Sequence, residues 1–521
     1  MPVGNAVAKA PHLVILGDQL TDQVGPLRAL IDGESHFARP VFVIEVTGVR
    51  RAKRHIQAVA MQVAALRTFA AELNTRGVET EVIAAETVQA ALTKLQARYR
   101  LDNLTLMDPA QPQERAAIEE WGSTSNLSVA VTENELWLTT RDEWAEFRTG
   151  RKELRMEFWY RRVRGARGWL MEESDATKPL GGTWNLDQEN RERLAVGTSV
   201  PVPPQRTVPS PVSEVLSELR AEGHDLFGSA EEFRWPITRA EALTELEAFC
   251  RDRLAGFGPY EDAMSREHDH LFHSLLSPAL NLGLLTPEEV CVRAMQEYAT
   301  RSSEIPLSSI EGFIRQILGW REFMHHTYVD FWREWESDNG LGAHHKLPEF
   351  YWSGETRMAC VSRVVQKLHR SGHAHHIERL MVLGNFALLF GVNPQEVDAW
   401  FLETFIDAFP WVVTPNVVAM SQFADLGRIT SKPYISGGAY ISRMGDDCSS
   451  CHYTPKESTG DRACPFTTLY WYFIDRHSER FARNPRMATQ VRAWVSRAEP
   501  VRQEIRARAK EIRGLVEKGE L

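Results

Sequence analysis

The 521-residue sequence lacks any uninterrupted apolar run of about 18 residues, the length that a membrane-spanning helix needs. It also lacks an N-terminal basic segment followed by an apolar one, which a secretory signal would have. We therefore expect a cytoplasmic protein with no membrane partner. In that reducing compartment, clustered cysteines favour a metal site over disulfides.

Positive charge is not in excess either, because the net charge is -10 at pH 7. The field of the whole molecule repels nucleic acid, so any nucleic-acid partner must be held by a local basic patch. With 43% hydrophobic residues the chain can bury a large core, and its length is typical of two or three domains.

Before about residue 150, short apolar runs alternate with helical patterns. This alternation predicts an α/β fold, a doubly wound parallel sheet covered by helices. The apolar runs are 12–16, 40–45, 78–83 and 104–107, and the helical patterns are 57–76 and 88–99. No Gly-x-Gly-x-x-Gly fingerprint follows the first run, which argues against a nicotinamide dinucleotide site there.

Five prolines predict an extended connector over 195–215. From about residue 240 the dominant period is helical and no repeat is evident, so we expect a compact all-helical domain. The expected helical stretches are 239–255, 307–334, 358–389 and 394–405. The predicted segments are an α/β domain over 10–145, a connector over 146–238 and a helical domain over 239–521.

Cysteine is scarce, with six residues in the chain, yet four of them are spaced as metal ligands. They are Cys360, Cys448, Cys451 and Cys464, and the last three form a Cys-x2-Cys-x12-Cys pattern. Thiolates at this spacing bind an iron-sulfur cluster or a zinc ion, and the spacing does not choose between the two. Ordinary buried cysteine is the third alternative, and we expect it for Cys250 and Cys291.

The densest basic segment interleaves positive and aromatic side chains between residues 151 and 169. Its basic residues are Arg151, Lys152, Arg155, Arg161, Arg162, Arg164 and Arg167. Such a segment can follow a phosphate backbone and stack on an unpaired base, so we expect DNA binding, chiefly by Arg151, Lys152, Arg155, Arg161 and Arg162. A solvated helix face is the alternative interpretation.

Three histidines and an arginine lie within residues 373–380. On a continuous helix, His373, His376 and Arg379 would share one face. A cation there lowers the proton affinity of the imidazoles, which disfavours a metal and suits an acid. We expect chemistry from His375 and His376, and a structural role for His373.

Several short motifs occur together, in an order that covers nearly the whole chain. They are Gly17-Asp18-Gln19-Leu20, Leu154-Arg155-Met156-Glu157, Gly181-Gly182-Thr183-Trp184-Asn185, Leu271-Phe272-His273-Ser274, the stretch 311–323, the His375-His376 pair, the stretch 420–425 and the four spaced cysteines. With these motifs the sequence resembles the iron-sulfur bacterial cryptochrome/photolyase family, the prokaryotic (6-4) photolyases or deoxyribodipyrimidine photolyase-related proteins.

The resemblance implies the photolyase/cryptochrome fold, in which an antenna domain precedes a helical domain that binds FAD, and it implies a [4Fe-4S] cluster on the four cysteines. The implied FAD contacts are Tyr260, His273, Ser274, Leu275, Leu276, Ser277, Gln316, Arg321, Arg379, Asp407 and Val413. The implied reaction is light-driven electron transfer from reduced FAD to a (6-4) photoproduct flipped out of UV-damaged DNA.

Individual roles also follow from the resemblance. His376, with His375 beside it, would donate a proton to the lesion, Tyr434 and Tyr440 would line the lesion pocket, and Trp400 and Trp352 would relay electrons to the flavin. Phe401 and Phe409 stand where relatives often have tyrosine. Fewer redox-active aromatic side chains therefore remain near the flavin.

Two positions depart from the family pattern. Val413 occupies the place that usually faces flavin N5, where relatives carry an acid or asparagine, and a valine can neither accept nor relay a proton. Of the ligands of a 6,7-dimethyl-8-ribityllumazine antenna, only Asp18 and Glu45 match in this region. Antenna binding is therefore an open expectation.

Three hypotheses result. The chain is a (6-4) photolyase, a cryptochrome-like photoreceptor with weak or no repair on the same scaffold, or a zinc-stabilised nucleic-acid-binding protein. Visible absorption separates the third hypothesis, because flavin and thiolate-bound iron are coloured and zinc is not. In each case we expect a monomer.

Overall fold

The computed structural model describes residues 10–50, 53–99 and 101–521. Internal contacts divide it into two compact units. Unit 1 comprises the described part of Met1–Arg141 with Pro204–Ala248 and Leu275–Arg293, and unit 2 comprises Asp142–Pro203, Phe249–Ser274 and Ala294–Leu521. The domain boundaries expected from the sequence stay predictions.

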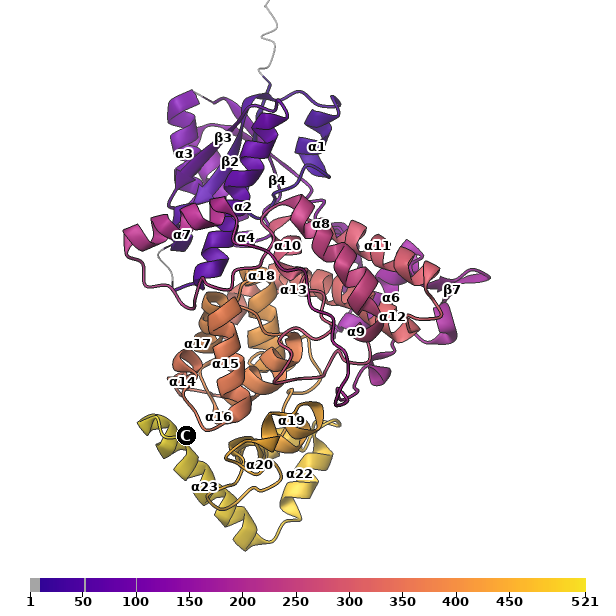
Figure 1. The fold of residues 1–521 in the computed structure, drawn as a ribbon, viewed down its shortest axis with the longest axis vertical. Helices are drawn as coiled ribbons and strands as arrows, with labels where there is room; N and C mark the ends of the chain where they lie inside the picture. Colours follow the sequence, from indigo (N-terminus) through magenta and orange to yellow (C-terminus); the bar gives the residue numbers. More distant parts are fainter. Residues whose placement is uncertain (1–9, 51–52, 100) are drawn as a thin grey trace, which may run out of the picture. The chain divides into compact units, whose positions relative to one another are not determined.

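Unit 1 is built on a parallel five-stranded sheet with the order β3-β2-β1-β4-β5. Its strands are β1 (His12–Ile15), β2 (Ala38–Val46), β3 (Thr80–Ala85), β4 (Asn103–Met107) and β5 (Ser128–Thr132). Helices α1 (Gly25–Ile31), α2 (Ile56–Thr75), α3 (Val88–Tyr99) and α4 (Pro112–Ser125) connect the strands and cover both faces of the sheet (Figure 1). The predicted α/β class is confirmed, although β5 escaped prediction because it is a short, half-polar edge strand.

The proline-rich connector is shorter than expected. Helix α7 (Ser210–Glu222) begins inside it, with Pro209 as its N-cap and Pro211 in its first turn. Proline is tolerated at this place because the first N–H groups of a helix have no intrahelical partner. The extended prediction for 210–215 was therefore wrong. Unit 1 also contains α8 (Arg239–Ala248) and α10 (Ser277–Leu282).

Unit 2 is helical, as predicted, apart from a small hairpin of β6 (Met171–Glu172) and β7 (Asp175–Pro179). Its helices include α6 (Met156–Arg167), α12 (Leu307–Ile314), α13 (Glu322–Trp335), α15 (Ala359–Ser371), α16 (Asn385–Phe390), α17 (Pro394–Thr404), α18 (Pro410–Thr414) and α19 (Gly438–Met444). At its C-terminal end, α20 (Pro465–Arg476), α22 (Ala488–Val495) and α23 (Glu499–Lys518) pack together (Figure 1).

Three of the four wide helical turns described in unit 2 interrupt its long helices, and the fourth is η4 (Phe249–Arg253). The three interrupting π-helical turns are η5 (Arg315–Arg321), η6 (Glu378–Gly384) and η7 (Pro415–Ser421). Such turns occur frequently at functional sites, because the extra residue re-aims side chains along the helix. Gln316, Arg321 and Arg379, all expected at the flavin, lie on two of them.

The histidine segment is not a continuous helix. Helix α15 ends at Ser371, because Gly372 takes the left-handed conformation with a φ of 64°. Residues 373–375 are irregular, so the expectation that His373 and His376 share a helix face was wrong. Within the described residues, no helix is both long and apolar enough to span a membrane.

Candidate functional site

The His375 ring is buried at the turn between α15 and the next helical segment. It stacks on the His273 ring at a centroid distance of 4.4 Å. Among the described residues, no side chain or backbone group forms a hydrogen bond with either of its ring nitrogens. A buried polar atom without a protein partner indicates a place where a ligand can bind.

His376 is exposed to solvent, yet protein surrounds it closely enough to change its proton affinity. Burial first and the charge of Arg379 second lower the pKa of its imidazole to about 4. His376 is therefore neutral at pH 7 in the chain alone.

Arg379 is held rigidly one turn after His376. Its two terminal nitrogens each lie 3.0 Å from an oxygen of Asp407, and its Nε donates to the Ala374 carbonyl at 2.6 Å. The guanidinium also lies 4.3 Å from the centre of the Phe405 ring. The charge pair expected beside a flavin is thus present, with its cation fixed in place by bidentate geometry.

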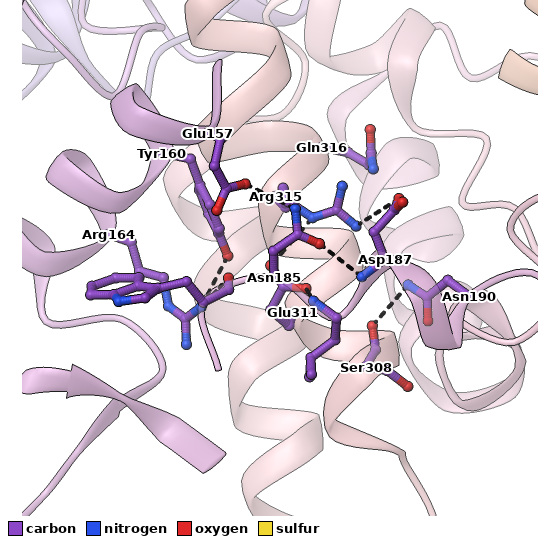
Figure 2. A network of polar contacts seen from close by, with 12 residues as sticks. Glu157, Tyr160, Arg164, Asn185, Asp187, Asn190, Ser308, Glu311, Arg315 and Gln316 are labelled. Atoms are coloured by element: carbon purple, nitrogen blue, oxygen red, sulfur yellow. Dashed lines mark hydrogen bonds and ion pairs between the residues drawn. The ribbon is translucent and has the colours of Figure 1, made fainter. Parts of the chain in front are cut away.

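A buried arginine fixes the segment that brings a carboxylate to the histidine (Figure 2). The Arg315 guanidinium lies 3.3 Å from Glu311 and 3.5 Å from Asp187. The Glu311 carboxylate also accepts a backbone N–H of segment 185–187 at 3.1 Å. These bonds hold the segment on α12 and η5, and the negative charge of Asp187 acts on His376, partly opposing that of Arg379.

Two further carboxyl groups have raised proton affinity. Burial raises the pKa of Glu261 to about 7, and this carboxyl accepts hydrogen bonds from Gln316 Nε2 at 2.7 Å and Asn190 Nδ2 at 3.2 Å. Burial likewise raises the pKa of Asp262 to about 6, and Asp262 accepts the Tyr440 hydroxyl at 3.4 Å. Strongly shifted acids grouped at one place are typical of functional sites.

Sequence reasoning missed four charged residues of this site, namely Asp187, Glu261, Asp262 and Arg315. Glu261 and Asp262 are isolated charges without diagnostic spacing, whereas Arg315 lies within the 311–323 motif and Asp187 lies close to the 181–185 motif, so these two could have been indicated. Tyr434, which was expected here, is desolvated, and burial followed by the charge of Asp187 raises its pKa.

The expected FAD-binding stretch 273–277 runs from one unit into the other, since Tyr260, His273 and Ser274 belong to unit 2 and Leu275 to Ser277 to unit 1. Tyr260 stacks on Phe272 at 5.2 Å. Leu275 has a φ of 61°, which is uncommon for a side chain of its size and typical of functionally constrained backbone. Arg321 pairs with Glu322 at 3.0 Å, and Val413 is buried in α18.

The four spaced cysteines line one cavity of about 310 Å³, which includes its opening to solvent. The other walls of the cavity are mostly apolar. Burial is the main cause that raises the pKa of the Cys464 thiol to about 12 and that of the Cys448 thiol to about 11. Within the described chain, no three or more His, Cys, Asp or Glu residues are grouped closely enough to hold a metal ion.

The two tryptophans of the expected relay are neighbours. Their ring centroids lie 6.5 Å apart with the planes at 81°. Trp400 is fully buried and Trp352 is partly exposed, so the pair extends from the interior to the surface of unit 2.

Most basic residues expected at DNA already have partners within unit 2. Arg161 pairs with Glu157 at 2.7 Å, and Arg162 with Glu146 at 2.6 Å. Arg151 donates to the Phe147 carbonyl, Arg155 donates to main-chain carbonyls including that of Arg428, and Lys152 is exposed. Arg164 is fully buried, so the expectation that it belongs to an exposed basic surface was wrong.

The expected antenna residues lie in unit 1. Burial raises the pKa of Asp18 to about 6. Glu45 pairs with the guanidinium groups of Arg50 and Arg67, the latter at 2.9 Å. Arg51 and Ala52, which belong to the same predicted stretch, lie outside the described residues.

Comparison with known proteins places these features in a family. A family model described as deoxyribodipyrimidine photo-lyase-related protein matches residues 13–235. A relative from Agrobacterium fabrum, named (6-4) photolyase, is 36% identical over 504 residues, which cover 95% of this chain and 98% of the relative.

Two solved structures share the fold. A bacterial class III photolyase from Agrobacterium tumefaciens has a TM-score of 0.57 and 18% identity, covering 85% of this chain and 88% of its own. A cryptochrome from Synechocystis sp. PCC6803 has a TM-score of 0.57 and 14% identity, covering 84% and 86%. The photolyase/cryptochrome fold is thereby confirmed. Because 36% identity to the Agrobacterium fabrum relative extends over nearly the full length of both chains, the protein belongs to the deoxyribodipyrimidine photolyase-related family of prokaryotic (6-4) photolyases.

Proposed function

We propose that the chain is a cytoplasmic, monomeric (6-4) photolyase that repairs UV-damaged DNA with light. One observation carries the proposal: His376, whose pKa burial and Arg379 lower, lies beside an arginine locked by Asp407. A cation stabilises a reduced flavin, and a solvent-accessible imidazole can exchange a proton with a bound base. The near full-length relative named (6-4) photolyase supports this assignment.

The residues present fit FAD. Arg379, Gln316 and Arg321 carry N–H donors that could face its ring. The His375 ring nitrogens form no hydrogen bond, although Nε2 lies 3.7 Å from Glu378, and they mark a place for a ligand. Tyr260 and residues 273–277 would hold the remainder of the cofactor. When bound, FAD supplies light absorption and the electron that the lesion receives.

The chain's own residues then control the proton. His376 holds the proton at its imidazole. The positive charge of Arg379 disfavours protonation of this imidazole, and the negative charge of Asp187 favours it. Negative charge bound beside His376, from a reduced flavin or from DNA phosphates, would raise the pKa of this imidazole and favour its acting as an acid. Tyr434 and Tyr440 would line the lesion pocket.

We propose that the four cysteines hold a [4Fe-4S] cluster rather than zinc, as the family resemblance implies. All four line one cavity, which supports their acting as a single ligand set. A polynuclear cluster ligated by four cysteines would occupy such a space. We also propose Asp18 and Glu45 as contacts of a ribityllumazine antenna.

Repair can be tested directly. The purified protein, with FAD confirmed by extraction, is photoreduced and mixed with an oligonucleotide that contains a (6-4) photoproduct. Blue light should then restore the thymines, whereas a dark sample and a His376→Asn variant should leave the lesion intact. Persistence of the lesion in illuminated wild type would refute the proposal.

A cryptochrome-like photoreceptor is the second candidate, and the buried Val413 favours it. A valine has no polar group, so position 413 itself offers no side chain to exchange the N5 proton. This candidate predicts that light reduces the flavin without repairing DNA. A Val413→Asn variant should then change the rate of flavin photoreduction, and an unchanged rate would show that position 413 does not act on the flavin.

A further inference from the structure

Four charged side chains form a buried chain of ion pairs in unit 2 that the chemistry above does not use. Arg363 contacts Asp447 at 2.7 Å and Glu378 at 2.8 Å, and Lys367 contacts Glu378 at 2.8 Å. The side chains of Lys367 and Glu378 are each 1% exposed. With two cations and two anions the group is neutral, which is the condition under which charges can be buried at all.

Glu378 lies at the centre of this group. Besides Arg363 and Lys367, its carboxylate accepts the backbone N–H of His375 at 3.1 Å. Burial alone would raise the pKa of Glu378, but Lys367, His375 and Arg363 together hold it well below its usual value.

The bond to His375 is half of a capping box. His375 is the residue before the helix that starts at His376, and Glu378 is the third residue of that helix. A glutamate at this place reaches back to the N–H of the cap residue and fixes how the helix begins. Arg379 closes the first helical bond, from its N–H to the His375 carbonyl at 3.1 Å.

The same carboxylate connects the histidines to the cysteine cavity. Arg363 and Lys367 belong to α15, which also carries Cys360, and Asp447 directly precedes Cys448. Helix α15, which bears Cys360, and the segment that bears Cys448 are therefore linked through these ion pairs to the helix that starts at His376. The capping-box glutamate is thus also held by two cations of α15, Arg363 and Lys367.

We propose that Glu378 is the positioning residue of the reaction: it sets the helix start that aims His376, and Arg363 and Lys367 anchor it to the cysteine-bearing helix. The proposal rests on the proposed repair function. It differs from a merely structural role, because buried ion pairs of this kind seldom add net stability and can often be replaced by apolar side chains.

Two variants test it. Glu378→Gln keeps the volume and an acceptor but leaves Lys367 without its counter-charge. The double variant Lys367→Met with Glu378→Gln removes one cation and one anion, so no unpaired buried charge remains if the single variant folds poorly. The matched control is Asp475→Asn, whose carboxylate likewise accepts from an arginine, Arg506 at 2.7 Å, and from an N–H, that of Trp494 at 2.9 Å.

In the holoprotein, both test variants should keep iron content, FAD content and lesion affinity within about twofold, while the single-turnover repair rate falls about 100-fold, as expected when a reacting group is misplaced by about 1 Å. Asp475→Asn should repair normally. An equal loss in the control, or a loss of repair that only follows loss of iron or FAD, would overturn the proposal.

A second measurement does not depend on repair. Diethyl pyrocarbonate is applied in the dark, and modified histidines are quantified by mass spectrometry. His375, which is shielded in the wild type, should become reactive in the Glu378 variants and stay unreactive in Asp475→Asn. Unchanged reactivity would overturn the positioning role even if the wild type repaired no lesion, so the two proposals fail separately.

Discussion

The imidazole of His376 has a protonation state that depends on what binds beside it. In the chain alone, burial and Arg379 lower its pKa to about 4, and bound anions act in the opposite direction. If this imidazole is the proton donor, repair should become faster as the pH is lowered from about 8 to about 6, because the protonated fraction grows. A repair rate that stays constant over this range would contradict the assignment.

Trp400 offers a second test at the residue scale. Replacing it with phenylalanine removes the buried member of the pair with Trp352, so light should reduce the bound flavin much more slowly, while FAD content stays the same. Trp494→Phe is the matched control, since Trp494 is equally buried but lies on α22. Equal photoreduction in both variants would exclude Trp400 from the relay.

Among the elements, α19 packs directly on the cysteine cavity. A Cβ atom added at Gly438 would lie 2.7 Å from the Cys464 sulfur and 2.8 Å from the Pro455 carbonyl oxygen, which is closer than such contacts allow. Gly438→Ala should therefore lower the iron content, measured per chain by a colorimetric assay. Gly514→Ala on α23 is the control, because its Cβ would meet no atom within 4 Å, and it should stabilise the helix by about 0.5 to 1 kcal/mol.

Elements also show what could be read from the sequence. The apolar runs of β1, β2 and β4 and the long pattern of α2 were predictable, because burial on both sides leaves few polar residues. Strand β5 was not, since its exposed edge carries little pattern. The break at Gly372 was missed because the apolar period continues across it, although the left-handed glycine ends the helix.

The site was predictable only in part for a related reason. The cysteine spacing and the His375-His376 pair are visible within short stretches of sequence. The resemblance to the family then assigns a role to each of them. Asp187, Glu261 and Arg315 come from segments far apart in the sequence and lie near one another only in the folded chain. Arg315 contacts Asp187, and the charge of Glu261 also acts on it. No pattern within a window of sequence records such long-range pairing.

For the whole molecule, buried neutral histidines predict acid sensitivity. Burial lowers the pKa values of His373 and His375 well below the usual 6.5, so the unfolded chain binds more protons than the folded one below that pH. Their contribution to the free energy of unfolding is complete above pH 6.5 and falls by about 1.4 kcal/mol per pH unit for each histidine as the pH decreases. A His373→Asn variant should flatten this slope in chemical denaturation, and an unchanged slope would contradict the prediction.

The central claim concerns the whole molecule as a repair enzyme. The most direct measurement counts the thymine pairs restored per photoreduced chain in a (6-4)-containing oligonucleotide under blue light. The account predicts more than one restored pair per chain, since the electron returns to the flavin and the protein acts catalytically. A flavin that is fully reduced by light while every lesion persists would contradict it.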